Sequence, residues 1–252
     1  MKLYSKRQAD YKPPVADRDS RLVFNASSVP LIDGSTEARK LTCLVVDDRQ
    51  DVLRVAFRSA SSIGTKISAA SKSAPESTPL LTFDIVVPET RRSDLDSLSD
   101  EKLVEILQAA NSNLSSLGMS INPDSISSAM TRLRSQPRPH GATDGLEALL
   151  LCAAIGVDLV ITDLDMPNLN GHGLLNALNG LTSVSGINRS TLPNVAVISG
   201  AFESCTTKDL IGDGASVVGI KPLDSAEFTT LINYSVFGVA TANPAECFEV
   251  RE

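Results

Sequence analysis

Four apolar stretches of this chain each end at a side chain that can take part in chemistry. In chain order, these side chains are Asp47 and Asp48 after residues 41–46, Asp163 after residues 157–162, Ser199 after residues 195–198 and Lys221 after residues 216–220. Carboxylates, a hydroxyl and an ammonium group suit the binding of a hard divalent cation and the transfer of a phosphoryl group. They can act together only if the fold brings these chain positions to one place.

The four stretches have the composition of buried parallel strands. They are rich in Val, Ile and Leu without polar alternation, and the one before Asp163 stops at that acid and then meets Pro167 and Gly171. In a doubly wound sheet the carboxyl ends of the parallel strands share one edge, where α/β folds bind ligands. The sequence therefore predicts that these side chains converge on one cleft.

Three carboxylates in a small cleft repel one another unless a cation neutralises them. Mg²⁺ suits such a site because it takes oxygen ligands from one or two carboxylates, from water and from phosphate. Asp163 can then attack a phosphoryl group, while Mg²⁺, Lys221 and the Ser199 hydroxyl stabilise charge on its equatorial oxygens. The expected product is an acyl phosphate on Asp163.

Helices alternate with these strands, as an α/β fold requires. A helix over residues 51–63, with Val52, Val55 and Ile63 among its apolar positions, is predicted to end at Gly64 in the left-handed conformation. Further helices are predicted over residues 144–151, around 174–178, and over 206–211 and 225–236. Two segments compete as the second strand, residues 65–70 and residues 80–87.

Between about residues 71 and 140 the alternation is interrupted. Helices are predicted over residues 100–117, with Ser99 as N-cap, and from Asn122 and Pro123 to about Leu133. We interpret them as a helical hairpin inserted into the sheet domain, whose apolar stripes pack on the domain or on a partner. We expect this hairpin to leave the cleft open, so that a folded chain lacking it still accepts a phosphoryl group.

The chain divides into an irregular leader over residues 1–40, the α/β domain over 41–237 and a tail over 238–252 that is too short for an effector domain. A formal charge of −7 disfavours nucleic acid as a ligand. No apolar segment reaches the roughly 20 residues that span a bilayer, so no membrane contact is expected. The four cysteines lack CxxC spacing and indicate free thiols in a reducing compartment, the cytoplasm: Cys43, Cys152, Cys205 and Cys247.

These motifs resemble the receiver domain of two-component response regulators. The likeness rests on motifs in family order, namely the acid pair Asp47-Asp48, Asp163-x-x-Met166-Pro167-x-x-x-Gly171, Ser199-Gly200 and Lys221-Pro222. It covers about residues 41–236 apart from the insertion. It implies a flavodoxin-like, doubly wound sheet of five parallel strands in the order 2-1-3-4-5.

The resemblance also implies roles for single residues. Asp163 would take a phosphoryl group from the phosphohistidine of a sensor histidine kinase or a histidine phosphotransfer protein. Mg²⁺ would be held by Asp48, Asp163 and the backbone carbonyl of Asp165, with Asp47 reaching it through water, and the peptide bond after Lys221 would be cis. A downstream protein partner would read the phosphorylated state. The chain would then be a phospho-acceptor with slow autodephosphorylation, and not an enzyme.

Two features depart from the family pattern. Val218 stands where members often carry an aromatic residue, three positions before the lysine, so the usual aromatic switch is missing. The insertion is also foreign to the family. Signalling through the standard surface is therefore not expected, whereas the acceptor chemistry is.

Two other functions stay open at this point. A pseudo-receiver would keep the acceptor residues and act only as an interaction module. The pair Asp163-x-Asp165 also resembles the nucleophile motif of haloacid-dehalogenase-type phosphatases, although that family places its other acids downstream. His140 and His172 have no carboxylate or cysteine at ligand spacing, so we expect loop or solvated residues and no phosphotransfer or metal site there.

Overall fold

The computed structural model describes residues 21–32, 38–74, 80–136, 139–184, 192–200 and 206–248. Its centre is a six-stranded sheet in the order β1-β6-β5-β4-β2-β3. The strands are β1 (Leu22–Phe24), β2 (Arg39–Val46), β3 (Leu81–Ile85), β4 (Leu159–Asp163), β5 (Asn194–Ser199) and β6 (Val217–Ile220). Strands β2 to β6 are parallel, and β1 is antiparallel to β6. The predicted α/β class is confirmed, and the five parallel strands, counted without β1, lie in the order 2-1-3-4-5.

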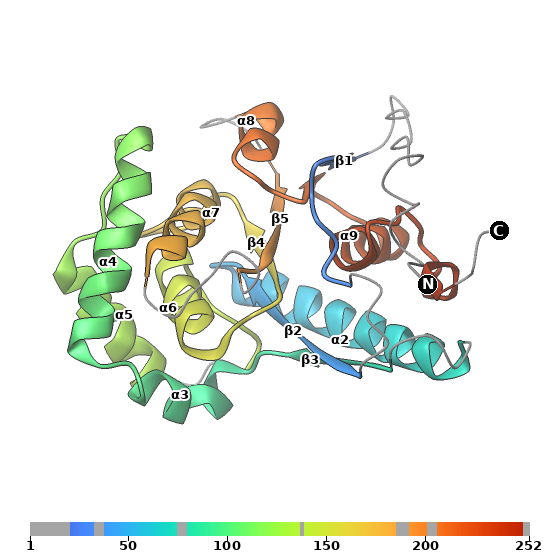
Figure 1. Ribbon diagram of the computed structural model, residues 1–252, viewed down its shortest axis with the longest axis horizontal. Coiled ribbons are helices and arrows are strands. Elements are labelled where there is room, and N and C mark those ends of the chain that lie inside the picture. The colour runs from blue at the N-terminus through green and yellow to red at the C-terminus, as the bar shows by residue number, and fades with distance from the viewer. Residues whose placement is uncertain are drawn as a thin grey trace.

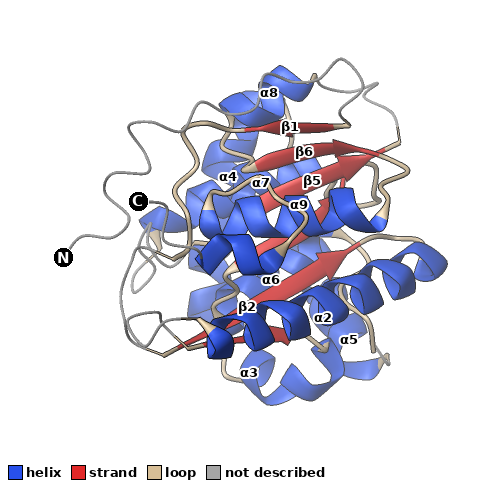
Figure 2. Ribbon diagram, turned by 90° about the vertical axis from the view of Figure 1, so that its right-hand side faces the viewer, coloured by secondary structure: helices blue, strands red, loops and turns tan. Residues whose placement is uncertain are grey.

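Helices cover both faces of this sheet (Figure 1). One face carries α2 (Gln50–Ser73) and α9 (Ser225–Phe237), which contact each other. Figure 2 looks onto the sheet from their side. The other face carries α6 (Gly145–Ile155), α7 (Gly171–Gly180) and α8 (Thr207–Gly212). Each face has its own hydrophobic core, as a doubly wound sheet requires.

The inserted segment adds a third layer outside α6 and α7, at the left of Figure 1. It contains the 3₁₀ turn η1 (Pro88–Arg91), α3 (Arg92–Asp96), α4 (Asp100–Leu114), the 3₁₀ turn η2 (Ser115–Leu117) and α5 (Pro123–Ser135). The predicted N-caps are confirmed, because the side chain of Ser99 accepts from Lys102 N and that of Asn122 accepts from Asp124 N. Helix α4 packs on α7, and α3 and α5 pack on α6.

This third layer explains the composition of α6. The residues from Gly145 to Cys152 are all buried, although they occupy every side of the helix. A helix that is apolar all round is buried all round, and here the sheet covers one side and the inserted helices the other. Ile106 of α4 and Leu133 of α5 belong to the same hydrophobic core as Leu44 of β2. The insertion is therefore part of the main core.

Helix α2 differs from the prediction at its C-terminal end. It does not stop at Gly64 but continues to Ser73, which removes residues 65–70 from the candidates for the second strand. Gly64 lies inside the helix, where a Cβ atom would come within 2.4 Å of Cδ1 of Phe83 on β3. The glycine thus allows close packing of helix against strand and does not terminate the helix.

The second parallel strand is therefore β3, so the insertion begins after Ile85 and not near residue 71. Deleting residues 71–140 would remove a strand of the sheet together with the insertion. The buried face of α2 also differs from the predicted one, since Leu53 and Ile67 face the core while Val55 is 63% exposed.

Replacing Gly64 with alanine is expected to destabilise the fold. Alanine ordinarily stabilises a helix by about 1 kcal/mol relative to glycine. Here the added methyl group would collide with the Phe83 ring, and overpacking of this kind typically costs about 1–3 kcal/mol. Chemical denaturation should show a lower free energy of unfolding. The matched control is Gly212→Ala on α8, where nothing lies within 4 Å of the added Cβ and no loss is expected.

The leader is not wholly irregular, because three of its residues form β1 at the edge of the sheet. Leu22 is buried, and Phe24 packs against Tyr234 of α9 with ring centroids 4.6 Å apart. The side chain of Asn25 donates to the carbonyl oxygens of Ile211 and Ala215, which ties β1 to the end of α8. Residues 1–20 lie outside the described part of the chain.

Within the described part of the tail, the 3₁₀ helix η5 (Pro244–Phe248) packs on α2 and α9. Phe248 lies edge-on to Phe237, with ring centroids 5.2 Å apart, and Cys247 is buried. Among the described residues, each helix is either too short or too polar to cross a bilayer.

Candidate functional site

The strand ends that carry the candidate residues lie side by side. Val46 of β2 pairs with Thr162 of β4, so Asp47 and Asp163 follow at neighbouring positions. Asp163 in turn pairs with Ile198 of β5. Ser199, at the end of β5, pairs with Ile220 of β6, directly before Lys221. The predicted convergence at one edge of the sheet is confirmed for the backbone of all four strands.

Side chains from three of these ends form one polar cluster. Asp47, Asp48 and Asp163 each offer a carboxylate oxygen, and these oxygens lie within 4.8 Å of one another. Lys221 Nζ is 2.8 Å from Asp47 Oδ2 and 3.0 Å from Asp163 Oδ1. With all groups ionised, three carboxylates and one ammonium group leave a net charge of −2 (−3 + 1). That is the charge a divalent cation balances.

Burial differs between the acids. Asp47 is buried, Asp163 is half-buried and Asp48 is exposed. Burial raises the pKa of Asp163, as does the charge of Asp47, and the contact with Lys221 only partly offsets them. For Lys221, burial lowers the pKa, but the hydrogen bonds to Asp47 and Asp163 outweigh it and leave the pKa above its ordinary value. Lys221 is therefore a fixed cation at neutral pH.

The raised pKa of Asp163 predicts that this residue lowers stability at neutral pH. Above its ordinary pKa of 3.8 and up to the raised folded value, the folded state binds more protons than the unfolded state. The free energy of unfolding therefore falls as the pH rises through this window, and stays lower above it. Without metal, Asp163→Asn should melt at a higher temperature than wild type at pH 7, and the difference should vanish below about pH 4.

The matched control for this measurement is Asp165→Asn, whose side chain is exposed two positions further along. It should melt like wild type in the same buffer. A melting temperature of Asp163→Asn below that of wild type at pH 7 would show that the ion pair with Lys221 outweighs the cost of burial.

The donor set fits Mg²⁺. Two oxygens bound to one Mg²⁺ ion at 2.0–2.1 Å lie about 3 to 4 Å apart, and the carboxylate oxygens of the cluster already meet within 4.8 Å. Asp47, Asp48 and Asp163 are the residues that would hold the ion. The Asp165 carboxylate does not belong to this cluster in the described structure, and the resemblance implies a role only for its backbone carbonyl.

The loop after Asp163 is shaped by close backbone contacts. A Cβ atom on Gly171 would lie 2.2 Å from the carbonyl oxygen of Asp163, so only glycine fits where α7 begins. Gly171 N donates to Leu164 O at 2.8 Å, and Leu164 N donates to Asp163 Oδ1 at 2.9 Å. The motif glycine thus closes the loop on the strand end, and the Leu164 amide orients the Asp163 carboxylate.

Ser199 and Lys221 are joined through the backbone, since Lys221 N donates to Ser199 O at 2.8 Å. Ser199 is fully buried at the end of β5. The peptide bond between Lys221 and Pro222 is cis, as the resemblance implies. The role of the Ser199 hydroxyl stays a prediction.

The chain that returns from the insertion also borders the acids, which the sequence did not reveal. Ala142 N donates to Val45 O, and Asp47 N donates to Ala142 O at 3.2 Å. A Cβ atom on Gly141 would lie 2.1 Å from Val45 O, and this glycine has a φ of 142°. Gly141 was the available signal, because a glycine after a proline-rich loop can mark a close backbone approach.

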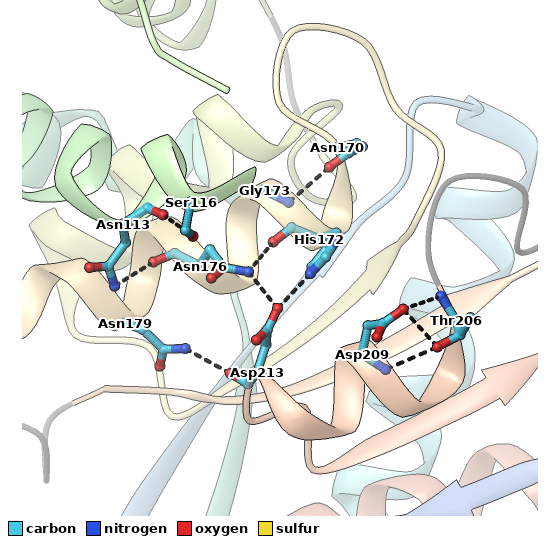
Figure 3. A network of polar contacts seen from close by, with 10 residues as sticks. All are labelled: Asn113, Ser116, Asn170, His172, Gly173, Asn176, Asn179, Thr206, Asp209 and Asp213. Atoms are coloured by element: carbon cyan, nitrogen blue, oxygen red, sulfur yellow. Dashed lines mark hydrogen bonds and ion pairs between the residues drawn. The ribbon is translucent and has the colours of Figure 1, made fainter. Parts of the chain in front are cut away.

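His172 is not the solvated residue that the sequence suggested. Its Nε2 lies 2.6 Å from Asp213 Oδ2, just after α8, and Asn176 Nδ2 donates to the same oxygen at 3.0 Å. Figure 3 shows both α7 side chains directed at this carboxylate, with Asn179 donating to the Asp213 backbone. Asn113 of the inserted α4 joins the network through Asn176 O. The group ties α8 to α7 and to the insertion, which is a structural role.

His140 packs against Phe57 of α2, with ring centroids 5.3 Å apart. Its Nδ1 is buried and has no hydrogen-bond partner within the described residues. Neither histidine belongs to the carboxylate cluster.

No protein-family model matches the chain. Among solved structures, a response regulator receiver domain protein from Clostridium thermocellum has 14% sequence identity and a TM-score of 0.41, over 78% of this chain and 94% of that chain. The signal receiver domain of an HD domain-containing protein from Pseudomonas fluorescens Pf-5 has 15% identity and a TM-score of 0.40, over 79% and 95%. The response regulator domain of CheB from Thermotoga maritima has 17% identity and a TM-score of 0.32, over 78% and 89%. The chain is thus similar to response regulator receiver domains, the family that its strand-end motifs resemble.

Proposed function

We propose that this chain is a phospho-acceptor receiver of a two-component phosphorelay, which takes a phosphoryl group onto Asp163 in the presence of Mg²⁺. The observation that carries the proposal is the contact of Lys221 Nζ with both Asp47 and Asp163, beside a third carboxylate, at the shared edge of the sheet. A half-buried lysine that contacts two carboxylates is not needed for a plain acidic surface cluster. It would stabilise the charge of a phosphoryl group that Asp163 gains.

The proposed reaction is a displacement at phosphorus. A carboxylate oxygen of Asp163 forms the new P–O bond, the P–N bond of a donor phosphohistidine breaks, and the imidazole leaves with a proton. Mg²⁺, when bound, supplies positive charge to the phosphoryl oxygens. Lys221 contacts the reacting carboxylate and stabilises charge on an equatorial oxygen, a role that we also assign to the Ser199 hydroxyl. The phosphoryl group stays on Asp163 until it is hydrolysed slowly. In this proposal the chain is therefore a phospho-acceptor and does not turn over a substrate as an enzyme does.

The haloacid-dehalogenase alternative finds no support in the site. It requires the Asp165 side chain to act beside Asp163, and Asp165 is not among the carboxylates that group with Asp163 in the described residues. The carboxylates that gather with Asp163 in the described structure are Asp47 and Asp48, which precede it in the chain.

We propose that the donor is a histidine kinase or phosphotransfer protein and that the output is protein contact, in the cytoplasm. The formal charge of −7 argues against a nucleic acid partner. Cys43 and Cys152 are free and buried, and burial raises the pKa of both thiols, as expected for inert cysteines in a reducing compartment. Cys247 is also buried. Cys205 lies outside the described residues.

The output surface is expected to differ from that of other receivers. Val218, at the position of the missing aromatic, is buried in β6 and pairs with Val23 of β1. The chain's own leader therefore covers this edge of the sheet. We propose that a downstream partner contacts the chain elsewhere.

The proposed function is tested by incubation with acetyl phosphate and intact-mass measurement. Wild type should gain one phosphoryl group with Mg²⁺ and none with EDTA, and Asp163→Asn should gain none in either buffer. The absence of a gain in the folded wild-type protein, under any divalent cation, would favour the pseudo-receiver.

A further inference from the structure

The loop between Asp163 and Gly171, here called the acceptor loop, is fastened to the start of α6. Asn168 lies at its tip with a φ of 61° and donates from Nδ2 to Asp144 Oδ2 at 2.7 Å. Gly145 N donates to Leu169 O at 3.0 Å, and a Cβ atom on Gly145 would lie 2.3 Å from that oxygen. The loop that positions Asp163 therefore depends on where Asp144 and Gly145 are held.

Asp144 is itself held by the insertion. It is 2% exposed, caps α6 by accepting from Glu147 N, and receives Arg132 Nη2 at 2.7 Å. Glu147 is fully buried, and its Oε1 accepts from Arg132 Nε at 3.0 Å. Its Oε2 accepts from the backbone and the hydroxyl of Thr143. One guanidinium group on α5 thus serves two buried carboxylates at the amino end of α6.

This arrangement leaves Asp144 dependent on Arg132. Two buried carboxylates so close together are tolerated only when a cation and hydrogen-bond donors satisfy them. The planar guanidinium donates to both at once, from Nη2 to Asp144 and from Nε to Glu147. Without Arg132, Asp144 would have to move toward solvent or become protonated, and in either case its contact with Asn168 would change.

We propose that Arg132 of the inserted helix is a positioning residue for phosphoryl acceptance, acting through Asp144 and Asn168 on the acceptor loop. The inference rests on the proposed function. It assigns the insertion a part in the acceptor apparatus, in contrast to the expectation from the sequence that the hairpin is dispensable. The loop it controls carries Asp165, whose backbone carbonyl is one of the suggested Mg²⁺ ligands.

Two substitutions break the connection at different points. Asn168→Gly deletes only the side chain that reaches Asp144, because glycine adopts a φ of 61° without strain. Arg132→Met removes the guanidinium at the other end. The matched control is Arg134→Met, on the same helix, which breaks an exposed ion pair with Asp96 of α3 and leaves α6 untouched.

The first readout needs neither metal nor phosphate. Amide hydrogen exchange, measured without divalent cations, reports on Leu169 N and Gly171 N, which donate to Pro167 O and Leu164 O within the acceptor loop. Both Asn168→Gly and Arg132→Met should speed exchange at these amides, while amides of β5 keep their wild-type protection. Arg134→Met should match wild type throughout.

The second readout is the rate of labelling by acetyl phosphate with Mg²⁺. We expect both variants to label about 10- to 100-fold more slowly than wild type, the range typical when an outer support of a metal site is lost. The double variant should be no slower than the worse single variant, because both act on one chain of contacts.

Wild-type labelling rates and loop exchange in both single variants would overturn the inference while leaving Asp163 as the acceptor. Faster exchange spread evenly over β5 and the loop would also overturn it, since that result indicates a purely structural role. If wild type itself is not labelled, the proposed function fails, and the exchange data alone still decide whether Arg132 holds the loop. Asn168→Gly keeps the test valid even if Arg132→Met does not fold.

Discussion

Lys221→Met slows the labelling of Asp163 by about 100- to 1,000-fold, the loss expected when one preorganised charge donor is removed from a reacting centre. Methionine keeps most of the aliphatic length of lysine but cannot stabilise negative charge. Lys221 Nζ contacts both Asp47 and Asp163, so its removal takes away the ammonium group that contacts the reacting carboxylate. Intact-mass time courses at saturating Mg²⁺ give the rate.

The same substitution separates chemistry from folding. Asp47 is 3% exposed and loses its ammonium partner in Lys221→Met, so the metal-free variant should melt at a lower temperature, and Mg²⁺ should restore part of the loss. Lys208→Met, on the exposed side of α8, is the control and should label and melt like wild type. A Lys221→Met variant that labels at the wild-type rate would remove the lysine from the mechanism.

Asp48→Ala weakens Mg²⁺ binding by more than about 100-fold, because a direct ligand contributes more than the 10- to 100-fold typical of an outer partner. Asp48 is the exposed member of the cluster, so its loss removes a ligand and leaves the packing intact. Mg²⁺ affinity measured by calorimetry should fall while the metal-free melting temperature stays unchanged, and labelling should be lost.

Two neighbours serve as references for this result. Asp47→Ala should weaken Mg²⁺ less but lower stability, because Lys221 loses a partner and Arg49 N loses its acceptor. Asp51→Ala removes an exposed carboxylate paired with Arg49 and should not affect Mg²⁺. Equal Mg²⁺ affinity in wild type and Asp48→Ala would contradict the assignment of this acid as a ligand.

The parts of the site that the sequence predicted share one physical cause. Asp163 and Lys221 follow apolar strands, and parallel strands share an edge, so chain position alone places their side chains together. The helix caps at Ser99 and Asn122 were predictable for a similar reason, because capping is a local interaction.

The parts that were missed depend on contacts between distant residues. The sequence predicts that Gly64 ends a helix, but this glycine lies inside α2, where the absence of a Cβ atom leaves room for the Phe83 ring. The neighbouring residues do not distinguish a helix-ending glycine from a close-packing one. A three-residue strand such as β1 carries too little apolar pattern to be recognised without its partner β6. Arg132 and Asn168 meet only through Asp144, so the link between the insertion and the acceptor loop could not be seen in the sequence.

The identity of the phosphorylated residue tests the proposed function most directly. Borohydride reduces an aspartyl phosphate to homoserine and leaves free carboxylates unchanged, so the reduced protein records where the acyl phosphate stood. After labelling with acetyl phosphate and Mg²⁺, reduction and peptide mapping should find homoserine at position 163 and aspartate at positions 47, 48 and 165. Homoserine at any of those other positions, or aspartate at position 163 in protein that has gained the phosphoryl mass, would contradict the account.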